Sequence, residues 1–464
     1  MSSFDPPPTQ PSFRSVNPRI LFPISPHPKN STSQSQPPAL PSPPRPPTFN
    51  DQYALSTHIV PAAYPRVAPD APLPQPMPAG LGKEERKRFL AEQTDTLVRA
   101  HEGFAELGKN CGTSVLWICV NRYSLRVGHE SDSGGGEEGK GLTLFFAHGN
   151  GFPKEIWEPS LHHLLADYSG PEISEIWTWE AVQHGDSYLL NQGQLSGRCD
   201  WMDNARDIMN FLANYLPTTA TQLEAALPVH LPRIPSAEAE TRRTSGHAKR
   251  TLAVVGHSYG GCSSASVAAH CPALFSSLVL VDPVIIQHVE RVGKDKTLYR
   301  YVQGALGRPD GWSSKEEALR VFKANPFFTA WDPAVLRAYI EHGTTADSAL
   351  GGVKLKTPGV QEAIVFASQT RFANEMWELL ERIDERVALR WVMPGDRDMQ
   401  SKGFENDDET RAKVWRRPAN ASNVRLPAGH LIPHERPREF ALDLRGYLED
   451  KYGDMHGGGK RARL

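Results

Sequence analysis

The sequence predicts an α/β protein in which a mainly parallel β-sheet is flanked by helices on both faces. Short apolar runs without strict alternation recur along the chain, which is typical of strands that are buried on both faces. Amphipathic helical stretches separate most of these runs, and this order of strand and helix favours parallel strand pairing. Of the 464 residues, 39% are hydrophobic and 22% are charged, which is the usual balance of a globular protein.

Residues 1–50 are predicted to be a disordered leader. Fifteen of these fifty residues are proline, mixed with Ser, Thr and Gln. Such a segment cannot bury enough apolar area to offset the entropy that is lost on ordering. We therefore expect the folded core to begin near residue 51.

The core is expected in two parts, residues 51–285 and 388–455. Both parts contain short apolar runs that are bounded by turn residues. The predicted strands are 53–60, 114–123, 142–147, 175–182, 251–256, 277–282 and 388–393.

Helices are predicted between and after these strands. A charged surface helix is expected over 83–107, and residues 200–216 and 438–450 are amphipathic at the helical spacing. Residues 218–250 are polar and interrupted by proline, so we expect a surface insertion there.

A helical cap is predicted over residues 286–387, where the β pattern disappears. Ser314 and Glu317 match a capping box, which opens a helix. Asp332 and Pro333 supply an N-cap and a first-turn proline for the next helix.

Charge, hydropathy and cysteine usage exclude several classes of protein. The net charge is -2, from 51 basic and 53 acidic side chains, so we expect no nucleic acid partner. No apolar run approaches the roughly 18 residues of a membrane span, so no transmembrane segment is expected. The five cysteines are scattered and contain no C-x-x-C pair, which argues against disulfides and a zinc site. No metal and no organic cofactor is expected.

The stretch TLAVVGHSYGGCSS, residues 251–264, carries the strongest chemical signal. An apolar strand enters Gly-x-Ser-x-Gly and continues into a helical stretch, which is the pattern of a nucleophile elbow. The turn is so tight that Gly256 and Gly260 must be small, and it exposes the hydroxyl of Ser258 at the carboxyl end of the sheet. Ser258 is therefore the candidate nucleophile.

A second glycine-rich loop follows the strand 142–147, in the sequence His-Gly-Asn-Gly. Such a loop can direct a backbone N–H toward a developing oxyanion, beside the N–H of the residue that follows the nucleophile. We assign these two backbone donors to Asn150 and Tyr259.

A serine needs a base that takes its proton, and an acid that orients the base. His430 lies late in the chain, between a short strand and the last amphipathic helix, and is the preferred base. His434 is the alternative, whereas His257 and His148 lie inside the turns that they build and are interpreted as structural.

The residue pattern does not decide which aspartate orients the histidine. Asp282 ends the strand after the nucleophile helix, while Asp396 and Asp398 follow the next strand, and each can reach the imidazole. An Asp before a proline is also a common strand terminator without chemistry.

With these motifs, the chain resembles the α/β-hydrolase superfamily, and more narrowly the fungal peroxisomal α/β-hydrolases. This group includes peroxisomal lipases, hydrolases of host-selective-toxin biosynthesis and the acyl-CoA hydrolase of mycophenolic acid biosynthesis. The similar stretches are GHSYGG, HGNGFPKEIWEP, CDWMDNARD, LVLVDPVI, WSSKEEALRVFKANPFF, GTTADS and PAGHLIP. The resemblance implies an α/β-hydrolase fold with a cap over the active site. The mycophenolic acid enzyme implies Asp282 as the acid, whereas the commoner position in the superfamily corresponds to Asp396; of the two, we prefer Asp282.

The resemblance also implies a function: hydrolysis of an acyl ester or thioester by Ser258, His430 and an aspartate. A non-catalytic ligand-binding protein of this fold and a C–C bond hydrolase with the same triad remain as alternatives. Aromatic residues of the cap are expected either to line an acyl pocket or to pack on one another. They are Trp312, Phe322, Phe327, Phe328 and Trp331.

Two further features bear on partners. A basic cluster can meet the phosphates of coenzyme A, or can be merely solvated; its members are Arg291, Lys294, Lys296 and Arg300. Residues 456–464 are predicted to be a flexible tail. Its last residues, Ala462, Arg463 and Leu464, have the form of a peroxisomal address, so a peroxisomal import receptor and the peroxisome matrix are expected.

Overall fold

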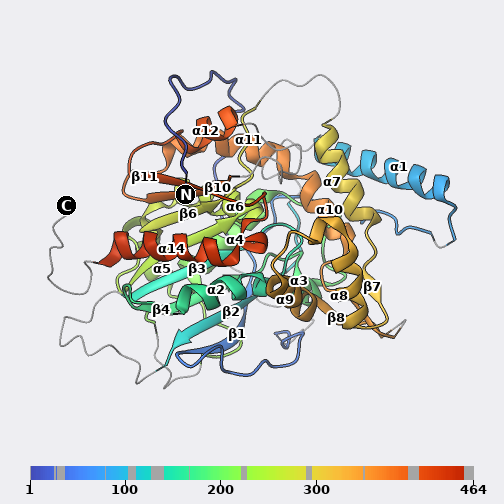
Figure 1. Cartoon of the computed structure of the whole chain (residues 1–464), viewed down its shortest axis with the longest axis horizontal. Coiled ribbons are helices and arrows are strands. Elements are labelled where there is room, and N and C mark those ends of the chain that lie inside the picture. The colour runs from blue at the N-terminus through green and yellow to red at the C-terminus, as the bar shows by residue number, and fades with distance from the viewer. Residues whose placement is uncertain are drawn as a thin grey trace.

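The computed structural model describes residues 2–25, 28, 37–78, 80–102, 111–126, 141–166, 168–220, 227–288, 295–348, 351–395 and 407–453. Within them lies a sheet of eight strands in the order β1-β2-β4-β3-β5-β6-β10-β11 (Figure 1). The strands are β1 (Tyr53–Pro61), β2 (Trp117–Leu125), β3 (Gly141–Ala147), β4 (Ile173–Trp179), β5 (Arg250–His257), β6 (Ser277–Val281), β10 (Ala388–Pro394) and β11 (Ala421–Leu426).

The six strands from β4 to β11 run parallel, and β2 pairs antiparallel with both β1 and β4. The predicted fold class, a mostly parallel sheet flanked by helices, is therefore confirmed. Successive side chains of a strand point to opposite faces, so an uninterrupted apolar strand serves two helical layers. In β3, Phe145 packs against Phe211 on one face, whereas Phe146 packs against Trp157 on the other.

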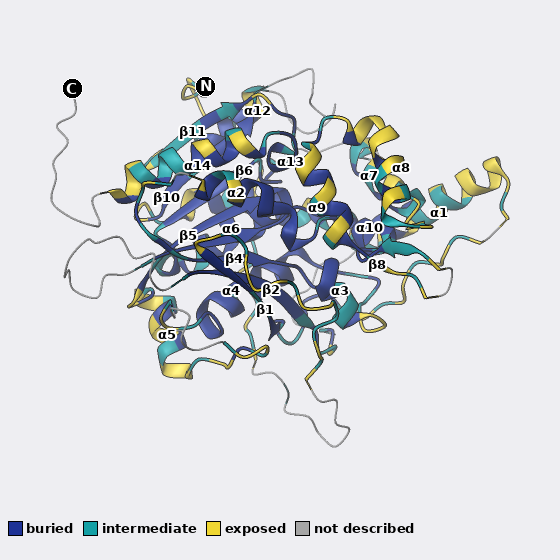
Figure 2. Cartoon of the chain, turned by 60° about the horizontal axis from the view of Figure 1, so that its bottom comes forward, coloured by how far each residue is buried: buried dark blue, intermediate teal, exposed yellow. Residues whose placement is uncertain are grey.

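The two helical layers enclose the sheet. The helices α2 (Glu158–Leu165) and α14 (Pro437–Tyr452) cross in front of the strands in Figure 1, and α4 (Trp201–Asn214) and α6 (Ser258–His270) pack on the opposite face. Figure 2 shows the sheet as the buried centre of the molecule, with exposed residues on the outer helices.

The stretch CDWMDNARD, which opens α4, anchors the segment after β1. Asp207 accepts a hydrogen bond from the N–H of Ala63 (2.7 Å) and pairs through both oxygens with Arg66 (2.6 and 3.0 Å). Asp203 accepts from the N–H of Val67 (2.9 Å). Removing one partner of a buried ion pair costs about 3–5 kcal/mol, so these acids hold the connection between β1 and the helical layer.

The leader differs from the predicted disorder in its described residues. It contains no helix or strand there, as its composition predicts, but it lies on the core. Phe4 is buried, and Arg19 pairs with Asp200 (2.6 Å) and Glu375 (2.5 Å). These acids come from segments of the chain that are distant in sequence, so composition alone does not reveal the contact.

The insertion between β6 and β10 contains helices and a small sheet. Ser314 caps α8 (Lys315–Ala324) through the N–H of Glu317, and Asp332 caps α9 (Pro333–Gly343) through the N–H of Ala334, as predicted. Three short strands, absent from the prediction of a helical cap over residues 286–387, are β7 (Gly311–Trp312), β8 (Thr344–Ala346) and β9 (Val353–Leu355). The helices are α7 (Lys296–Gly307), α8 (Lys315–Ala324), α9 (Pro333–Gly343), α10 (Gly359–Ala367) and α11 (Gln369–Leu379).

Two of these helices connect the insertion to other parts of the fold. The helix α11 packs against α6, within the core layer. The helix α7 packs against α1 (Lys83–Glu102), which comes from the beginning of the chain and lies beside it in Figure 1. The insertion is therefore attached both to the core layer and to a helix from the early part of the chain.

The remaining helices are short. One of them, α5 (Ser236–Ser245), lies in the insertion 218–250, for which no helix was predicted because its sequence is polar and contains prolines. The others are η1 (Lys154–Trp157), α3 (Gly185–Asn191), η2 (Pro272–Leu274), η3 (Pro326–Phe328), η4 (Leu380–Arg382), α12 (Asp407–Val414) and α13 (Ile432–Glu435). None of the helices in the described part of the chain has the length and apolar character that a membrane span requires.

Candidate active site

The turn between β5 and α6 presents Ser258. The strand ends at His257 and the helix begins at the next residue, so Ser258 takes a left-handed conformation with φ of 52°. This conformation is strained for a residue with a side chain. A Cβ atom on Gly260 would lie 2.4 Å from the carbonyl oxygen of Ala147, and one on Gly256 would lie 2.6 Å from the Cα of Gly261. The two glycines are therefore required by close approach of the backbone.

The structure brings Ser258, His430 and Asp282 together. His430 Nε2 lies 3.0 Å from Ser258 Oγ, and His430 Nδ1 lies 2.6 Å from Asp282 Oδ2. The strands β5 and β6 are parallel neighbours, so the residues that follow them meet at one edge of the sheet. His430 reaches the same edge from the loop after β11.

The chemistry of the partners sets the proton positions. An ionised carboxylate only accepts hydrogen bonds, so His430 Nδ1 donates to Asp282 and Nε2 is left to accept from the hydroxyl of Ser258. Burial by itself raises the pKa of Asp282, but the electrostatic interaction with the neighbouring His430 and the hydrogen bond to it outweigh burial and hold this pKa below its usual value. Asp282 therefore stays ionised, as the orientation of the imidazole requires.

The alternatives to this arrangement are placed elsewhere. His434 is buried, and neither of its ring nitrogens has a hydrogen-bond partner among the described residues. Its ring packs at a tilt against the rings of Phe152 and Trp331, and it makes no hydrogen bond to Ser258. Asp396 and Asp398 lie outside the described residues.

His257 supports the loop of His430, the candidate base. Its Nε2 donates to the carbonyl oxygen of His430 at 3.0 Å, which holds the loop that carries the imidazole. Burial, followed by the nearby His430, lowers the pKa of His257 to about 3, so it is neutral at neutral pH.

The loop after β3 lies against the turn of Ser258. The N–H of Gly260 donates to the carbonyl oxygen of His148 at 3.1 Å, and a Cβ atom on Gly149 would lie 3.3 Å from the Cβ of Ser258. His148 Nδ1 donates to the carbonyl oxygen of Gly149 (2.7 Å), and its Nε2 accepts from the N–H of Ala181 (3.1 Å). The imidazole of His148 therefore braces the loop that contains Asn150.

Asn150 and Tyr259, the two predicted backbone donors, are both buried. Tyr259 lies in the first turn of α6, where a backbone N–H has no intrahelical partner. The side chain of Asn150 binds two residues that the sequence did not single out: its Oδ1 accepts from His184 Nε2 (2.9 Å), and its Nδ2 donates to the carbonyl oxygen of Glu362 (3.0 Å). No local signal marks these partners, since both are distant from Asn150 in sequence.

A buried ionic cluster joins the cap to the core beside this loop. Lys154 Nζ lies 2.7 Å from one oxygen of Asp186, and Lys356 Nζ lies 2.6 Å from the other. Glu180 is also close to Lys154, at 3.5 Å, and burial raises the pKa of Glu180 to about 7. Lys356 belongs to the insertion, so the cluster is a polar link across the cap–core boundary.

The aromatic residues of the cap pack on one another. Phe322, Phe328 and Trp331 are buried in mutual ring contacts, while Phe327 is 57% exposed. Trp331 also contacts Phe152, which follows the glycine-rich loop of the core. The cluster therefore seats the cap on the core next to the site.

The predicted basic cluster and the C-terminal tail lie partly or wholly outside the described residues. In the basic cluster, Lys296 and Arg300 are exposed on α7, while Arg291 and Lys294 lie outside the described residues, as does the tail with Ala462, Arg463 and Leu464. No group of His, Cys, Asp and Glu within the described ranges is arranged to hold a metal ion.

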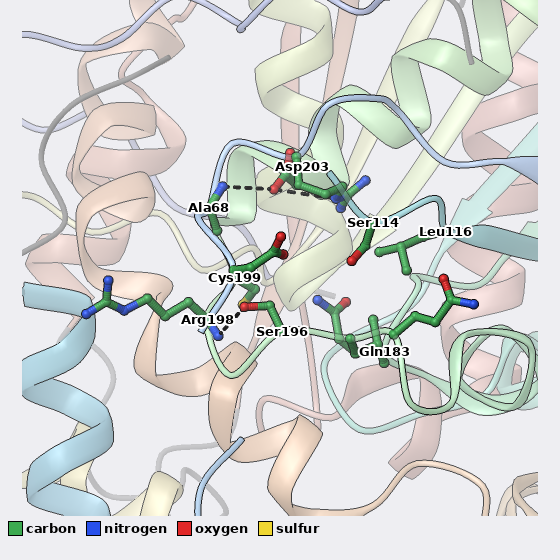
Figure 3. A pocket seen from close by; sticks show the side chains of 12 residues that line it. Ala68, Ser114, Leu116, Gln183, Ser196, Arg198, Cys199 and Asp203 are labelled. Carbon is green, nitrogen blue, oxygen red and sulfur yellow. Dashed lines mark hydrogen bonds and ion pairs between the residues drawn. The ribbon is translucent and has the colours of Figure 1, made fainter. Parts of the chain in front are cut away.

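A small crevice opens elsewhere in the core, near the start of α4 (Figure 3). Its volume is about 20 Å³, which admits about one water molecule. Its lining includes Cys199, Gln183 and Asp203, but not Ser258 or His430. This crevice is therefore separate from the candidate active site.

Residues 144–444 match the model of a family described as the alpha/beta hydrolase family. The type I acyl-CoA thioesterase mpaH of Penicillium brevicompactum is 28% identical over 254 residues, which cover 50% of this chain and 52% of that protein. The peroxisomal membrane protein LPX1 of Saccharomyces cerevisiae is 26% identical over 250 residues, which cover 50% of this chain and 57% of that protein. The chain thus spans about half the length of these curated relatives.

Among solved structures, the peroxisomal alpha-beta-hydrolase Lpx1 of Saccharomyces cerevisiae aligns with a TM-score of 0.60. The alignment covers 89% of this chain and 93% of that chain, at 18% sequence identity. At this identity the likeness shows the fold.

The free energy of unfolding is expected to fall as the pH drops from about 7 to about 5. Burial lowers the pKa of His58 and His148 to about 4, and that of His247 and His257 to about 3. In the unfolded chain these groups titrate near about 6.5, so the unfolded chain binds more protons over this range and stability rises with pH. Each histidine contributes up to about 1.4 kcal/mol per pH unit to this change in the free energy of unfolding. Glu180 acts in the opposite direction, because burial raises its pKa to about 7 and it therefore binds more protons in the folded chain.

Urea denaturation at several pH values in this range measures the effect. The variant His247→Gln, outside the candidate site, removes one of the buried groups and should flatten the slope. A midpoint that does not change between neutral and mildly acidic pH would contradict the burial of these histidines in neutral form.

Proposed function

Because the chain belongs to the alpha/beta hydrolase family, we propose that it is a serine hydrolase that cleaves an acyl ester or thioester. The observation that carries the proposal is the pair of hydrogen bonds that joins Ser258 to His430 and His430 to Asp282. A serine at a left-handed turn, an imidazole whose Nε2 faces the serine hydroxyl and a partly buried carboxylate are the parts that nucleophilic acyl transfer requires.

In the first half of the reaction, Ser258 Oγ attacks the carbonyl carbon of the substrate while His430 Nε2 takes the hydroxyl proton. The imidazolium that forms is stabilised by Asp282, which stays ionised. The carbonyl oxygen becomes an oxyanion and accepts hydrogen bonds from the N–H groups of Asn150 and Tyr259. Collapse of the intermediate breaks the bond to the alcohol or thiol, which leaves with the proton from His430.

In the second half, water attacks the acyl-serine with His430 as the base. The same two N–H groups bind the second oxyanion, and the acid leaves as Ser258 regains its proton. Aspartate at position 258 would suit epoxide or haloalkane hydrolysis on this scaffold, whereas the serine present there suits acyl transfer.

We favour an acyl-CoA thioester as the substrate class, because the mpaH relative is named an acyl-CoA thioesterase. A thiolate is a good leaving group, so formation of the acyl-serine needs only modest help from the protein. The acyl chain would lie between the core and the cap, where Phe152 meets Trp331.

We also place the protein in the peroxisome matrix, imported by a receptor that binds the C-terminal Ala462, Arg463 and Leu464. The relative LPX1 carries a peroxisomal name, which supports this location. A fluorescent protein fused to the N-terminus should give peroxisomal puncta that disperse when the last three residues are deleted. Puncta that survive the deletion would contradict the assigned signal.

Substitution of the triad is expected to remove activity while the fold is kept. Ser258→Ala and His430→Ala should each lower kcat by about 10⁴–10⁶-fold, because the nucleophile and its base act as a unit. A fluorophosphonate probe should label the wild type and fail to label Ser258→Ala. Ser264→Ala is the matched control, since this buried serine on the same helix has no hydrogen-bond partner among the described residues.

The identity of the acid is tested in the same assay. Asp282→Asn should lower kcat by about 10⁴-fold, whereas Asp396→Asn and Asp398→Asn should stay near the wild type. The reverse order would assign the acid to the loop after β10, and a wild type that resists the probe would favour a non-catalytic binding protein.

The leaving group is tested with matched substrates. For one short acyl chain, kcat/KM is measured on the coenzyme A thioester, on a small thioester and on an alkyl ester. We expect the coenzyme A thioester to be at least about tenfold better than the small thioester, which corresponds to about 1.4 kcal/mol of binding to the coenzyme part. Equal kcat/KM values for the two thioesters would show that the protein does not recognise the coenzyme A part of the substrate, and would indicate a general esterase.

A further inference from the structure

We propose that Asn150 is a positioning residue: its side chain, held between the core and the cap, aligns its own backbone N–H as oxyanion donor. The proposal rests on the hydrolase reaction set out above. It assigns to the side chain of Asn150, and to His184 and Glu362, a role that the glycine-rich motif does not reveal.

The peptide group between Gly149 and Asn150 is the object that is aligned. It is trans and planar, so its carbonyl and its N–H point in opposite directions. The carbonyl oxygen of Gly149 accepts from His148 Nδ1 at 2.7 Å, which fixes one side of the plane. The N–H of Asn150 therefore points away from the imidazole of His148. If this peptide plane rotated, the N–H would no longer point toward the position of the oxyanion.

The side chain of Asn150 fixes the other side of the plane. Its Oδ1 accepts from His184 Nε2 at 2.9 Å, and its Nδ2 donates to the carbonyl oxygen of Glu362 at 3.0 Å. Asn150 and His184 are both buried, so water does not compete for these bonds. Two bonds at opposite ends of one amide leave the side chain, and the Cα to which it is attached, a single orientation.

His184 is suited to this role because it stays neutral. Burial, followed by the neighbouring His148, lowers the pKa of His184 well below its usual value. An amide oxygen only accepts, so Nε2 carries the proton of the neutral ring. Its Nδ1 is buried without a hydrogen-bond partner among the described residues. Within that part of the chain, the ring of His184 is therefore held by its hydrogen bond to Asn150.

The third point of attachment belongs to the cap. Glu362 lies in α10, and its carboxylate reaches the loop: a Cβ atom on Gly151 would lie 3.0 Å from Glu362 Cδ. Arg308, at the end of α7, pairs with the same carboxylate. The glycine-rich loop is therefore in contact with the cap through both the backbone and the side chain of Glu362, and the position of the cap bears directly on Asn150.

The consequence for the reaction is a separation of kcat from KM. A hydrogen bond to the carbonyl oxygen strengthens as negative charge develops, so a misaligned donor weakens the transition state more than the bound substrate. Removing one complete oxyanion donor typically lowers kcat by about 10²–10³-fold. A donor that is present but misaligned should lose less, about 10–100-fold.

The test uses paired variants of the full chain. Asn150→Ala keeps the backbone N–H but loses both side-chain bonds, and should lower kcat by about 10–100-fold with KM within about threefold of the wild type. His184→Leu should act in the same direction, because it leaves Asn150 Oδ1 unpaired. His184→Gln supplies an amide N–H in place of Nε2 and should restore kcat to within about threefold of the wild type.

Each outcome separates this proposal from the proposed function. If the wild type does not react with the fluorophosphonate probe, the hydrolase reaction itself is rejected. If the wild type reacts and Asn150→Ala and His184→Leu keep kcat within about twofold, Asn150 has no positioning role. A rise in KM with kcat unchanged, or a His184→Gln as slow as His184→Leu, would also overturn the proposal.

Thermal melting guards against a trivial loss of fold. If His184→Leu melts before the assay temperature, Asn150→Asp replaces it: this variant keeps an acceptor for His184 but cannot donate to the carbonyl oxygen of Glu362. It should lower kcat as Asn150→Ala does, and a wild-type kcat would overturn the coupling to the cap.

Discussion

The close contact between the end of β3 and the turn after β5 is the constraint on which the rest of the site depends. The carbonyl of His148 accepts from the N–H of Gly260, and a Cβ atom on Gly260 would collide with Ala147. The turn that carries Ser258 and the loop with the glycine-rich motif are thereby held at a fixed distance from each other. The strands β3, β5, β6 and β10 are consecutive parallel neighbours, so their carboxyl ends lie at the same edge of the sheet. Asp282 directly follows β6 and therefore lies at this edge as well. The strain at Ser258 persists because every neighbour of the turn is packed.

Buried polar groups lie beside this contact, and the pairs that they form attach the cap to the core. Lys154, Asp186 and Lys356 form an ion cluster that would be costly to bury without mutual pairing. Asn150 and His184 add neutral hydrogen bonds beside it. Apolar contact between Phe152 and Trp331 covers the same boundary from another side. The cap is thus attached by groups that require particular geometry, unlike a purely apolar interface, which tolerates sliding.

Motifs with a mechanical cause were predictable from the sequence. Gly256 and Gly260 flank Ser258 because the turn leaves no room for a side chain at either position. The five-residue motif Gly-x-Ser-x-Gly predicts this requirement directly. The caps at Ser314 and Asp332 are local in the same sense. The helix α5, the small sheet of the cap and the contacts of Arg19 were not predictable, because each depends on surfaces that exist only after the core has folded. The partners of Asn150 belong to this second group.

The sequence by itself determined the fold class, the two-sided burial of the strands and the residue types at the candidate site, since hydrophobic period and turn sterics act over a few residues. Only the tertiary structure decided which acid faces His430 among the described residues, that His430 and not His434 faces Ser258, and which residues hold the glycine-rich loop. Those outcomes depend on distances between segments up to about two hundred residues apart, such as the 2.6 Å between His430 and Asp282. Such a distance is set by the packing of whole strands and helices, and a single sequence motif contains no information about that packing.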